Sequence, residues 1–371
     1  MQWTNHKARC CNKQRLMLNG LQVAIVLVMF LFNVNNINAA GATFRTCNFL
    51  SRERRDRSNQ ALHIGEYFGL TYDEPVFRPP AEANSLILQV TLGCSWNKCT
   101  FCEMYQTKDF QPRPLSEIES ELKMVAECGG TEYVRDIFLA DGDAMTLSTE
   151  SLVNICDTVN RYFPKVRRIS SYCLPRNLMK KTTDDLKRLR EAGISLVYVG
   201  CESGDDTVLK AVKKGESHLS SISALSKLSE ANIKTSVMIL IGLGGKLLSK
   251  QHAKHSAELV NVAKPNFLSA LVVSFPLGEE RVHEGYDLIG SGTFEPLSPR
   301  ETLEELEMFL SYIDDSDKGV QRIIFRSDHA SNYFVLKGRL REKTRLMQEI
   351  RCALDDPDES SHLRPEWMRG L

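Results

Sequence analysis

Three cysteines crowd into one short segment of the chain, directly after an apolar run with the composition of a β-strand. Cys94, Cys99 and Cys102 follow residues 85–90, Ser-Leu-Ile-Leu-Gln-Val. Thiolates are the ligands that iron–sulfur clusters take, and three can hold three corners of a four-iron, four-sulfur cubane while the fourth iron stays open for chemistry. A structural zinc site needs four ligands, usually as two spaced pairs, and the cysteines after Cys102 are isolated from one another. The segment therefore predicts a metal-ligating loop, with three buried thiols in an apolar loop as the alternative.

Strand-like and helix-like segments alternate beyond residue 80, which is typical of a parallel sheet. The predicted strands are 86–92, 135–140, 166–172, 195–200, 234–242 and 267–275. The predicted helices are 117–128, 149–162, 183–192, 205–213, 218–231 and 249–263. Ser116 and Glu119 have the spacing of a capping box, and Gly129-Gly130 and Gly193 predict helix ends.

The cysteine segment resembles the cluster loop of the radical S-adenosylmethionine superfamily, which places three cysteines after the first strand and an aromatic residue before the third. Phe101 has that place, although four residues rather than the common three separate Cys94 from Cys99. The resemblance implies a [4Fe–4S] cluster and S-adenosylmethionine as cofactors. It also implies an open, partial parallel (β/α)6 TIM-like barrel over residues 81–285, with the reactive groups at the carboxyl ends of the strands.

Residues after the second and fourth predicted strands match family segments that bind the methionyl and ribose groups. Asp141, Gly142 and Asp143 stand where the superfamily binds the methionyl amino group, and either carboxylate could accept from an ammonium. Glu202 and Ser203 stand where a carboxylate and a hydroxyl contact the ribose and the methionyl group. An ordinary turn and a helix N-terminus are the structural alternatives for these two segments.

Further cofactor contacts are implied near the third, fifth and sixth strands. Gly242 and Gly244 resemble the glycines that let adenine lie against the backbone, and Pro276 resembles the last contact on the adenine side. Many relatives carry an acid after the third strand, and this chain has none there. Ser171 and Arg176 are the remaining candidates for the cofactor carboxylate, with a solvated loop residue as the alternative for Arg176.

The amino-terminal part of the chain has the features of a targeting region. Basic residues precede an apolar run over 21–32, which is short for a membrane span but suits a signal peptide, so residues 1–42 predict a signal, targeting or anchor segment. Contact with a membrane is expected only through residues 16–33. Residues 43–80 predict a linker with an arginine-rich, transit-like start. Together they favour location in an organelle such as a plastid. The second alternative is a membrane-anchored protein whose catalytic domain faces a reducing compartment.

Composition and the carboxyl-terminal region complete the prediction. The 47 basic and 47 acidic residues balance, which disfavours nucleic acid as a partner, and 11 cysteines suit metal binding in a reducing compartment. Residues 286–371 predict a helical appendage, with helical apolar spacing over 300–312 and 336–354. A polar run after the strand-like 323–325 predicts a substrate contact, with helix capping as the alternative; its members are His329, Ser331, Asn332 and Tyr333.

These features predict an enzyme that cleaves S-adenosylmethionine to a 5′-deoxyadenosyl radical, which abstracts hydrogen from a substrate. Such an enzyme needs a low-potential electron donor of the flavodoxin or ferredoxin type. Two alternatives remain: methylthio or methyl transfer to RNA on the same fold, and a non-catalytic iron–sulfur or zinc protein that senses redox state.

Overall fold

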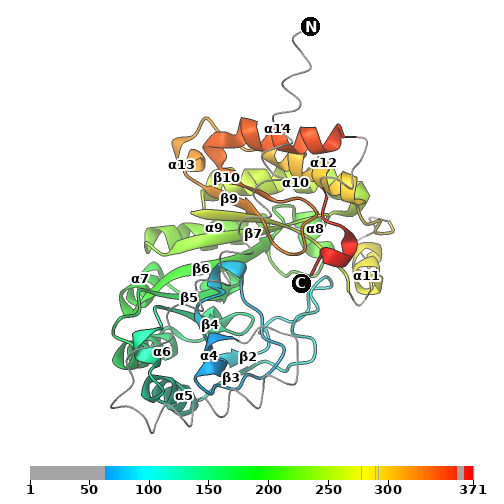
Figure 1. Cartoon of the computed structure of the whole chain (residues 1–371). Coiled ribbons are helices and arrows are strands. Elements are labelled where there is room, and N and C mark those ends of the chain that lie inside the picture. The colour runs from blue at the N-terminus through cyan, green and yellow to red at the C-terminus, as the bar shows by residue number, and fades with distance from the viewer. Residues whose placement is uncertain (1–62, 277, 289, 291, 357–362, 371) are drawn as a thin grey trace, which may run out of the picture. The chain divides into compact units, whose positions relative to one another are not determined.

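Apolar segments of four to nine residues form a single large sheet at the centre of the computed structural model (Figure 1). The structure describes residues 63–276, 278–288, 290, 292–356 and 363–370. The strands of the large sheet, in spatial order, are β1 Leu86–Gln89, β4 Asp136–Ala140, β5 Arg168–Cys173, β6 Ile194–Glu202, β7 Lys234–Ile241, β8 Phe267–Val272, β9 Ile324–Ser327 and β10 Leu336–Arg339. Adjacent strands from β1 to β9 run parallel, and β10 pairs antiparallel with β9. The order is linear, so the sheet is an open, partial barrel and the predicted fold class is confirmed.

The six predicted strands are all present, and helices connect them as the alternating pattern requires. The helices are α4 Ile64–Tyr67, α5 Leu115–Glu127, α6 Thr149–Tyr162, α7 Thr183–Ala192, α8 Asp206–Ala211, α9 His218–Glu230, α10 Gly245–Ala263, α11 Glu280–Leu288, α12 Pro299–Ser311, α13 Lys318–Gln321 and α14 Lys343–Leu354. Each long helix buries one apolar stripe; α5, for example, buries Ile118, Leu122 and Val125 at helical spacing. A second, two-stranded antiparallel sheet joins β2 Thr91–Leu92 to β3 Gln111–Pro112.

The predicted capping box at the start of α5 is wrong. The helix begins at Leu115, its N-cap is Pro114, and no side chain caps it. Ser116 lies inside the first turn. Glu119 instead accepts hydrogen bonds from Arg161 at 2.8 Å and from Tyr162 at 3.2 Å, both on α6. The Glu119 carboxylate therefore links α5 to α6 and does not cap α5.

The carboxyl-terminal region extends the sheet in addition to packing helices on it. β9 and β10 come from the predicted helical appendage, and α12 packs against both α10 and α14 (Figure 1). The helix predicted over 336–354 begins only at Lys343. Leu336 is buried and Lys337 is exposed, which is the alternation of a strand whose one face is covered, and pairing with β9 takes up this segment.

Residues 63–80 belong to the folded unit, so the linker prediction is wrong for this part of 43–80. The Tyr72 hydroxyl donates to the Ile87 carbonyl at 3.0 Å. Asp73 and Gln89 exchange two hydrogen bonds of 2.9 Å, which fixes this segment beside β1. The predicted segments 1–42 and 16–33 lie outside the described residues. Within the described ranges, no helix is both long and apolar enough to cross a bilayer.

Aromatic side chains from β4, β5 and β6 pack together in the interior of the sheet. The rings of Phe138, Tyr172 and Tyr198 make edge contacts at centroid distances of 5.0 to 6.2 Å. Glu82, which is fully buried just before β1, accepts hydrogen bonds from the Tyr198 hydroxyl at 2.6 Å and from Arg168 at 3.0 Å. This packing fills the space between β4, β5 and β6 and ties it to the segment before β1.

Asn332 holds the end of β8, and its replacement tests how much the carboxyl-terminal region stabilises the sheet. Its amide oxygen accepts from the Val272 N–H at 2.6 Å, and its amide nitrogen donates to the Ala270 carbonyl at 2.9 Å. Asn332→Ala would leave both buried backbone groups without these partners, so we expect the free energy of unfolding to fall by about 2–4 kcal/mol. Urea unfolding followed by circular dichroism measures this change.

The matched control is Asn154→Ala, an exposed asparagine on α6, which should change the free energy of unfolding by less than about 0.5 kcal/mol. Equal stabilities of the two variants would contradict the role given to Asn332.

Candidate active site

The three cysteines of the predicted cluster loop are free thiols gathered at the carboxyl ends of β1 and β4. Cys99 is buried, and Cys94 and Cys102 are partly buried. Burial raises the pKa of all three thiols, that of Cys99 to about 12, and the charges of Cys102 and Cys94 raise the pKa of Cys99 further. Three interacting thiolates in a buried space need positive charge beside them, which bound iron supplies.

Backbone hydrogen bonds shape the cysteine loop. Arg281 on α11 donates to the carbonyls of Cys99 at 3.0 Å and Cys102 at 3.1 Å, and the Thr100 N–H donates to the Val212 carbonyl at 3.0 Å. Among the described residues, no group of three or more His, Cys, Asp or Glu side chains is arranged around a single metal ion. The three thiols are the donor set that a [4Fe–4S] cluster takes, with each thiolate bound to a different iron.

The end of β4 approaches the cysteine loop so closely that glycine is required there. A Cβ atom on Gly142 would lie 2.8 Å from the Cβ of Cys94, and the Gly142 N–H donates to the Gly93 carbonyl at 3.1 Å. Gly93 itself has φ of 67°, a left-handed conformation that favours glycine. These contacts place the neighbouring carboxylates, Asp141 and Asp143, beside the cysteine loop.

Asp141 has one carboxylate oxygen engaged and one open. Oδ2 accepts from Lys108 at 3.0 Å and from the Gly93 N–H at 3.3 Å, whereas Oδ1 is buried with no hydrogen-bond partner among the described residues. The buried hydroxyl of Tyr105 also lacks a partner in this part of the chain. Burial, and then the charge of Asp141, raise the pKa of Tyr105 well above its usual value. An unpaired carboxylate oxygen and an unpaired hydroxyl near the thiols fit a ligand that carries an ammonium group.

Asp143, by contrast, is committed to the fold. Its carboxylate accepts from the Ser95 N–H at 2.8 Å, from the Ser95 hydroxyl, and from Asn177 at 3.1 Å. It therefore joins the cysteine loop to the short 3₁₀ helix Pro175–Leu178. The two carboxylates that the sequence left as alternatives have different environments, and Asp141 is the one with an open oxygen.

Glu202, at the end of β6, pairs with a buried lysine that the sequence analysis missed. The Glu202 carboxylate lies 3.0 Å from the Lys214 ammonium, and both side chains are almost fully buried. Burial alone would lower the pKa of Lys214, but the charges of Glu202, Cys99 and Cys102 outweigh it and raise the pKa, so the ammonium stays charged. Lys214 therefore offers a cation beside the cysteines. Lys214 directly follows Lys213 in the sequence, and no local signal distinguishes the two lysines. The burial of Lys214 is seen only in the folded structure.

Ser203 and the glycines near β7 form a second layer behind the site. The Ser203 hydroxyl is bonded to His252 Nδ1 at 2.7 Å and accepts from the Asp205 N–H at 2.9 Å. The Gly242 N–H donates at 2.7 Å to Glu305, a fully buried residue on α12 whose pKa is raised by burial. Gly244 is the N-cap of α10. Ser203 is thus occupied within the protein, and Gly242 is held by a residue of the carboxyl-terminal region.

Ser171 and Arg176, predicted for the cofactor carboxylate, are engaged elsewhere. The buried Ser171 hydroxyl donates to the Tyr172 carbonyl at 2.9 Å. Arg176 forms an ion pair of 2.9 Å with Glu216, and its guanidinium carbon lies 3.5 Å from the centre of the Trp96 ring. Both side chains therefore have partners within the protein, as the Lys214 ammonium has in Glu202.

A cavity of about 320 Å³ lies at the ends of β7 and β8. It brings Gly242 together with Tyr333 and Arg369 of the carboxyl-terminal region. Pro276 is exposed and is absent from the described lining. Burial, and then a hydrogen bond to Glu366, raise the pKa of Tyr333 to about 12.

Of the remaining residues predicted to contact substrate, Asn332 has its amide fully engaged with β8 and Ser327, which removes it from that set. His329 and Ser331 bond to each other at 2.9 Å, and burial lowers the pKa of His329. Tyr333 is therefore the one member of the predicted polar run that lines the described cavity.

Comparisons with known proteins cover the part of the chain that contains the cysteine loop. The model of the Radical SAM superfamily matches residues 88–250, which include the cysteine loop and the ends of β4 and β6. The heme chaperone HemW of Bacillus subtilis is 23% identical over 163 residues, which are 43% of this chain and 42% of HemW. A putative methylthiotransferase of Methanocaldococcus jannaschii, MJ0865, is 24% identical over 226 residues, 54% of this chain and 48% of that protein. The chain thus spans about half the length of these curated relatives.

Solved structures show a looser likeness. The radical S-adenosylmethionine methyltransferase TsrM from Kitasatospora setae has a TM-score of 0.47 at 15% identity, over 76% of this chain and 65% of TsrM. The cobalamin-dependent radical enzyme OxsB has a TM-score of 0.45 at 16% identity, over 78% of this chain and 39% of OxsB. The superfamily uses a [4Fe–4S] cluster and S-adenosylmethionine, which the free thiols and the unpaired Asp141 oxygen fit. The family match and the three cysteines thus identify residues 88–250 of this chain as similar to the Radical SAM superfamily.

Proposed function

We propose that this protein is an enzyme that binds a [4Fe–4S] cluster through Cys94, Cys99 and Cys102 and cleaves S-adenosylmethionine. The observation that carries the proposal is the meeting of three free thiols with the unpaired groups of Asp141 and Tyr105 at the carboxyl ends of the strands. When bound, the cluster and S-adenosylmethionine would together supply a 5′-deoxyadenosyl radical able to abstract hydrogen from a substrate. The superfamily acts on a substrate and needs a reductant.

The residues around the thiols have distinct proposed tasks. Asp141 accepts a hydrogen bond from the methionyl ammonium at Oδ1, because that oxygen has no partner among the described residues. Burial raises the pKa of this carboxyl, and Lys108, which pairs with Oδ2 at 3.0 Å, opposes that rise. Lys214 faces the methionyl carboxylate, and Glu202 accepts from the ribose hydroxyls. Their mutual ion pair of 3.0 Å orients both side chains before the cofactor arrives.

Water exclusion is the second task of the chain. The rings of Phe138, Tyr172 and Tyr198 pack against one another in the interior of the sheet, and this packing would exclude water from that space. The cavity between Gly242 and Tyr333 offers space at the open side. We assign the adenine side of the cofactor to Gly242 and the substrate side to Tyr333, in keeping with their places at the strand ends and in the carboxyl-terminal region.

Serine variants of the three cysteines test the proposal. Cys94→Ser, Cys99→Ser and Cys102→Ser should each lose the cluster and all formation of 5′-deoxyadenosine, because a harder hydroxyl replaces one of three ligands. Anaerobic reconstitution with iron counting, followed by reduction and chromatography of the nucleoside product, measures both effects. The control is Cys156→Ser, a buried thiol on α6, which should keep the cluster. Loaded cluster in a variant of the triad, or no product from loaded wild-type protein, would refute the proposal.

Asp141→Asn tests the assignment of the ammonium contact. The amide keeps the shape of the side chain but removes its charge, so S-adenosylmethionine affinity should fall about ten- to a hundredfold, the value of a charge-assisted hydrogen bond of about 1.5–3 kcal/mol. Equilibrium dialysis on cluster-loaded protein measures the affinity, with visible absorption as a check that the cluster is intact.

Asp136→Asn is the matched control, because Asp136 begins the same strand at the opposite end and pairs with Arg167. It should bind S-adenosylmethionine as the wild type does. An Asp141→Asn protein with wild-type affinity would show that the cofactor ammonium is held elsewhere.

A further inference from the structure

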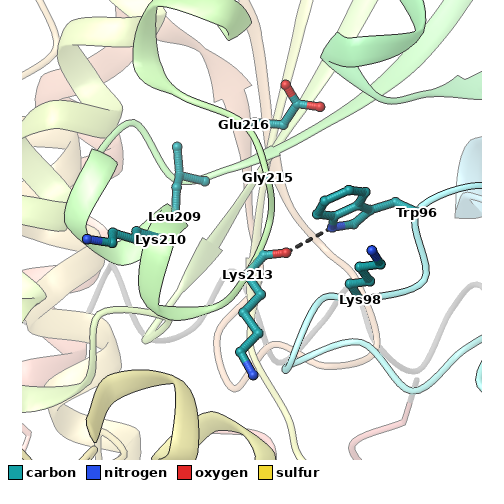
Figure 2. Close-up of a pocket in the computed structure, with 7 residues that line it drawn as sticks. All are labelled: Trp96, Lys98, Leu209, Lys210, Lys213, Gly215 and Glu216. Atoms are coloured by element: carbon teal, nitrogen blue, oxygen red, sulfur yellow. Dashed lines mark hydrogen bonds between the residues drawn. The ribbon is translucent and has the colours of Figure 1, made fainter. Parts of the chain in front are cut away.

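The outer side of the cysteine loop carries a basic surface that the proposed chemistry does not use. A pocket of about 420 Å³ lies between this loop, which carries Trp96 and Lys98, and the turn after α8, which carries Lys213. Figure 2 shows its lining residues, among them Lys210, which lies on α8 itself. We call the three lysines and Trp96 the basic patch. Lys98, Lys210 and Lys213 are all exposed.

The positive charge of the basic patch is not neutralised within the described part of the chain. None of its lysines forms an ion pair there, and the one carboxylate of the pocket lining, Glu216, is paired with Arg176 at 2.9 Å. The whole chain has a formal net charge of zero, so this concentration of charge is a local feature. Such a surface attracts an acidic partner and raises the rate of encounter.

The basic patch is joined rigidly to the cluster loop. The Trp96 indole N–H donates to the Lys213 carbonyl at 2.8 Å, and the Thr100 N–H donates to the Val212 carbonyl at 3.0 Å. Arg176 stacks on Trp96 at 3.5 Å, and the Lys98 ammonium lies 5.0 Å from the centre of the same ring. A partially exposed tryptophan stacked with arginine is the kind of anchor on which protein interfaces depend.

The position of the basic patch indicates what its partner does. Lys98 directly precedes Cys99, and Trp96 lies between Cys94 and Cys99 in the sequence. A protein that docks here would contact the same loop that carries the cysteine thiols. Short separation is what electron transfer needs, whereas a substrate must reach the interior from the open ends of the strands.

Resting on the proposed function, we propose that the basic patch is the docking surface for an acidic, low-potential one-electron carrier protein of the ferredoxin type. One electron would pass from the reduced carrier to the oxidised cluster, so the carrier is oxidised by one electron and the cluster is reduced by one. No proton or chemical group is exchanged. Lys98, Lys210 and Lys213 would steer and hold the carrier, with Trp96 as the apolar anchor.

The test compares the rates at which two reductants reduce the cluster. The variant is Lys98→Glu/Lys210→Glu/Lys213→Glu, and the matched control is Lys180→Glu/Lys234→Glu/Lys250→Glu, three exposed lysines outside the pocket lining with the same change of charge. Stopped-flow absorption follows cluster reduction by a pre-reduced plant-type [2Fe–2S] ferredoxin of net negative charge, and by photoreduced 5-deazariboflavin, a small molecule that needs no docking surface.

We expect the patch variant to be reduced by ferredoxin at least tenfold more slowly than wild type and control at low salt, and equally fast by deazariboflavin. The wild-type rate with ferredoxin should fall as salt is added, a measurement that needs no variant. Equal ferredoxin rates for variant and wild type, or a wild-type rate independent of salt, would overturn the proposal. Unchanged ferredoxin reduction together with lost binding of a single-stranded RNA oligonucleotide would assign the surface to nucleic acid instead.

The two proposals fail in distinguishable ways. Cluster reduction is read before any cleavage of S-adenosylmethionine, so a protein that is reduced normally but forms no 5′-deoxyadenosine disproves the catalytic function and leaves the docking result standing. If Lys98→Glu disturbs the cysteine loop, Lys210→Glu/Lys213→Glu leaves that loop unaltered and should still slow reduction by ferredoxin severalfold.

Discussion

The electrostatic balance around the buried cysteine thiols is the constraint on which the site depends. Cys94, Cys99 and Cys102 share their surroundings with the carboxylates of Asp141 and Glu202, and burial raises the pKa of every one of these thiols. Lys108 and Lys214 each pair with one of the carboxylates at 3.0 Å. The charge of Lys214 also lowers the pKa of Cys99 and Cys102, and a bound cluster would supply further positive charge beside the thiolates.

The carboxyl-terminal region contributes to the site by holding the strands that form it. Glu305 on α12 accepts from the Gly242 N–H, and Asn332 completes the backbone hydrogen bonds at the end of β8. Tyr333 and Arg369 then line the cavity beside Gly242. Residues after the superfamily match therefore support the ends of β7 and β8, where the cofactor and substrate are proposed to meet.

Local patterns predicted most of the fold because its signals lie within a few residues. The six parallel strands, and helix ends at Gly129 and Gly193, follow from apolar runs and left-handed glycine positions. The capping box predicted at Ser116 is wrong, and Glu119 instead accepts hydrogen bonds from two residues of α6. The segment of β10 was predicted as helix because its pairing with β9 cannot be seen in the local pattern of apolar residues. Contacts between segments that are distant in the sequence cannot be predicted from the residues next to either partner.

Family motifs predicted candidate residues of the site, but the sequence did not predict which of two similar residues is buried. Motif and strand position predicted the cysteines, Asp141 and Glu202 as candidate site residues. Nothing in the sequence separated Asp141 from Asp143, or the buried Lys214 from the exposed Lys213. The orphaned hydroxyl of Tyr105 was missed for the same reason. The hydrogen bonds of the folded chain distinguish these residues, because they leave some buried polar groups without a partner and satisfy others.

The central claim is that the cysteine cluster leaves one iron open and that S-adenosylmethionine binds next to it. The most direct measurement is the electron paramagnetic resonance spectrum of the reduced, cluster-loaded protein before and after addition of S-adenosylmethionine. Binding at the open iron should change the spectrum of wild-type protein and, at the same cofactor concentration, change that of Asp141→Asn less. A spectrum that S-adenosylmethionine leaves unaltered at saturating concentration would contradict the account.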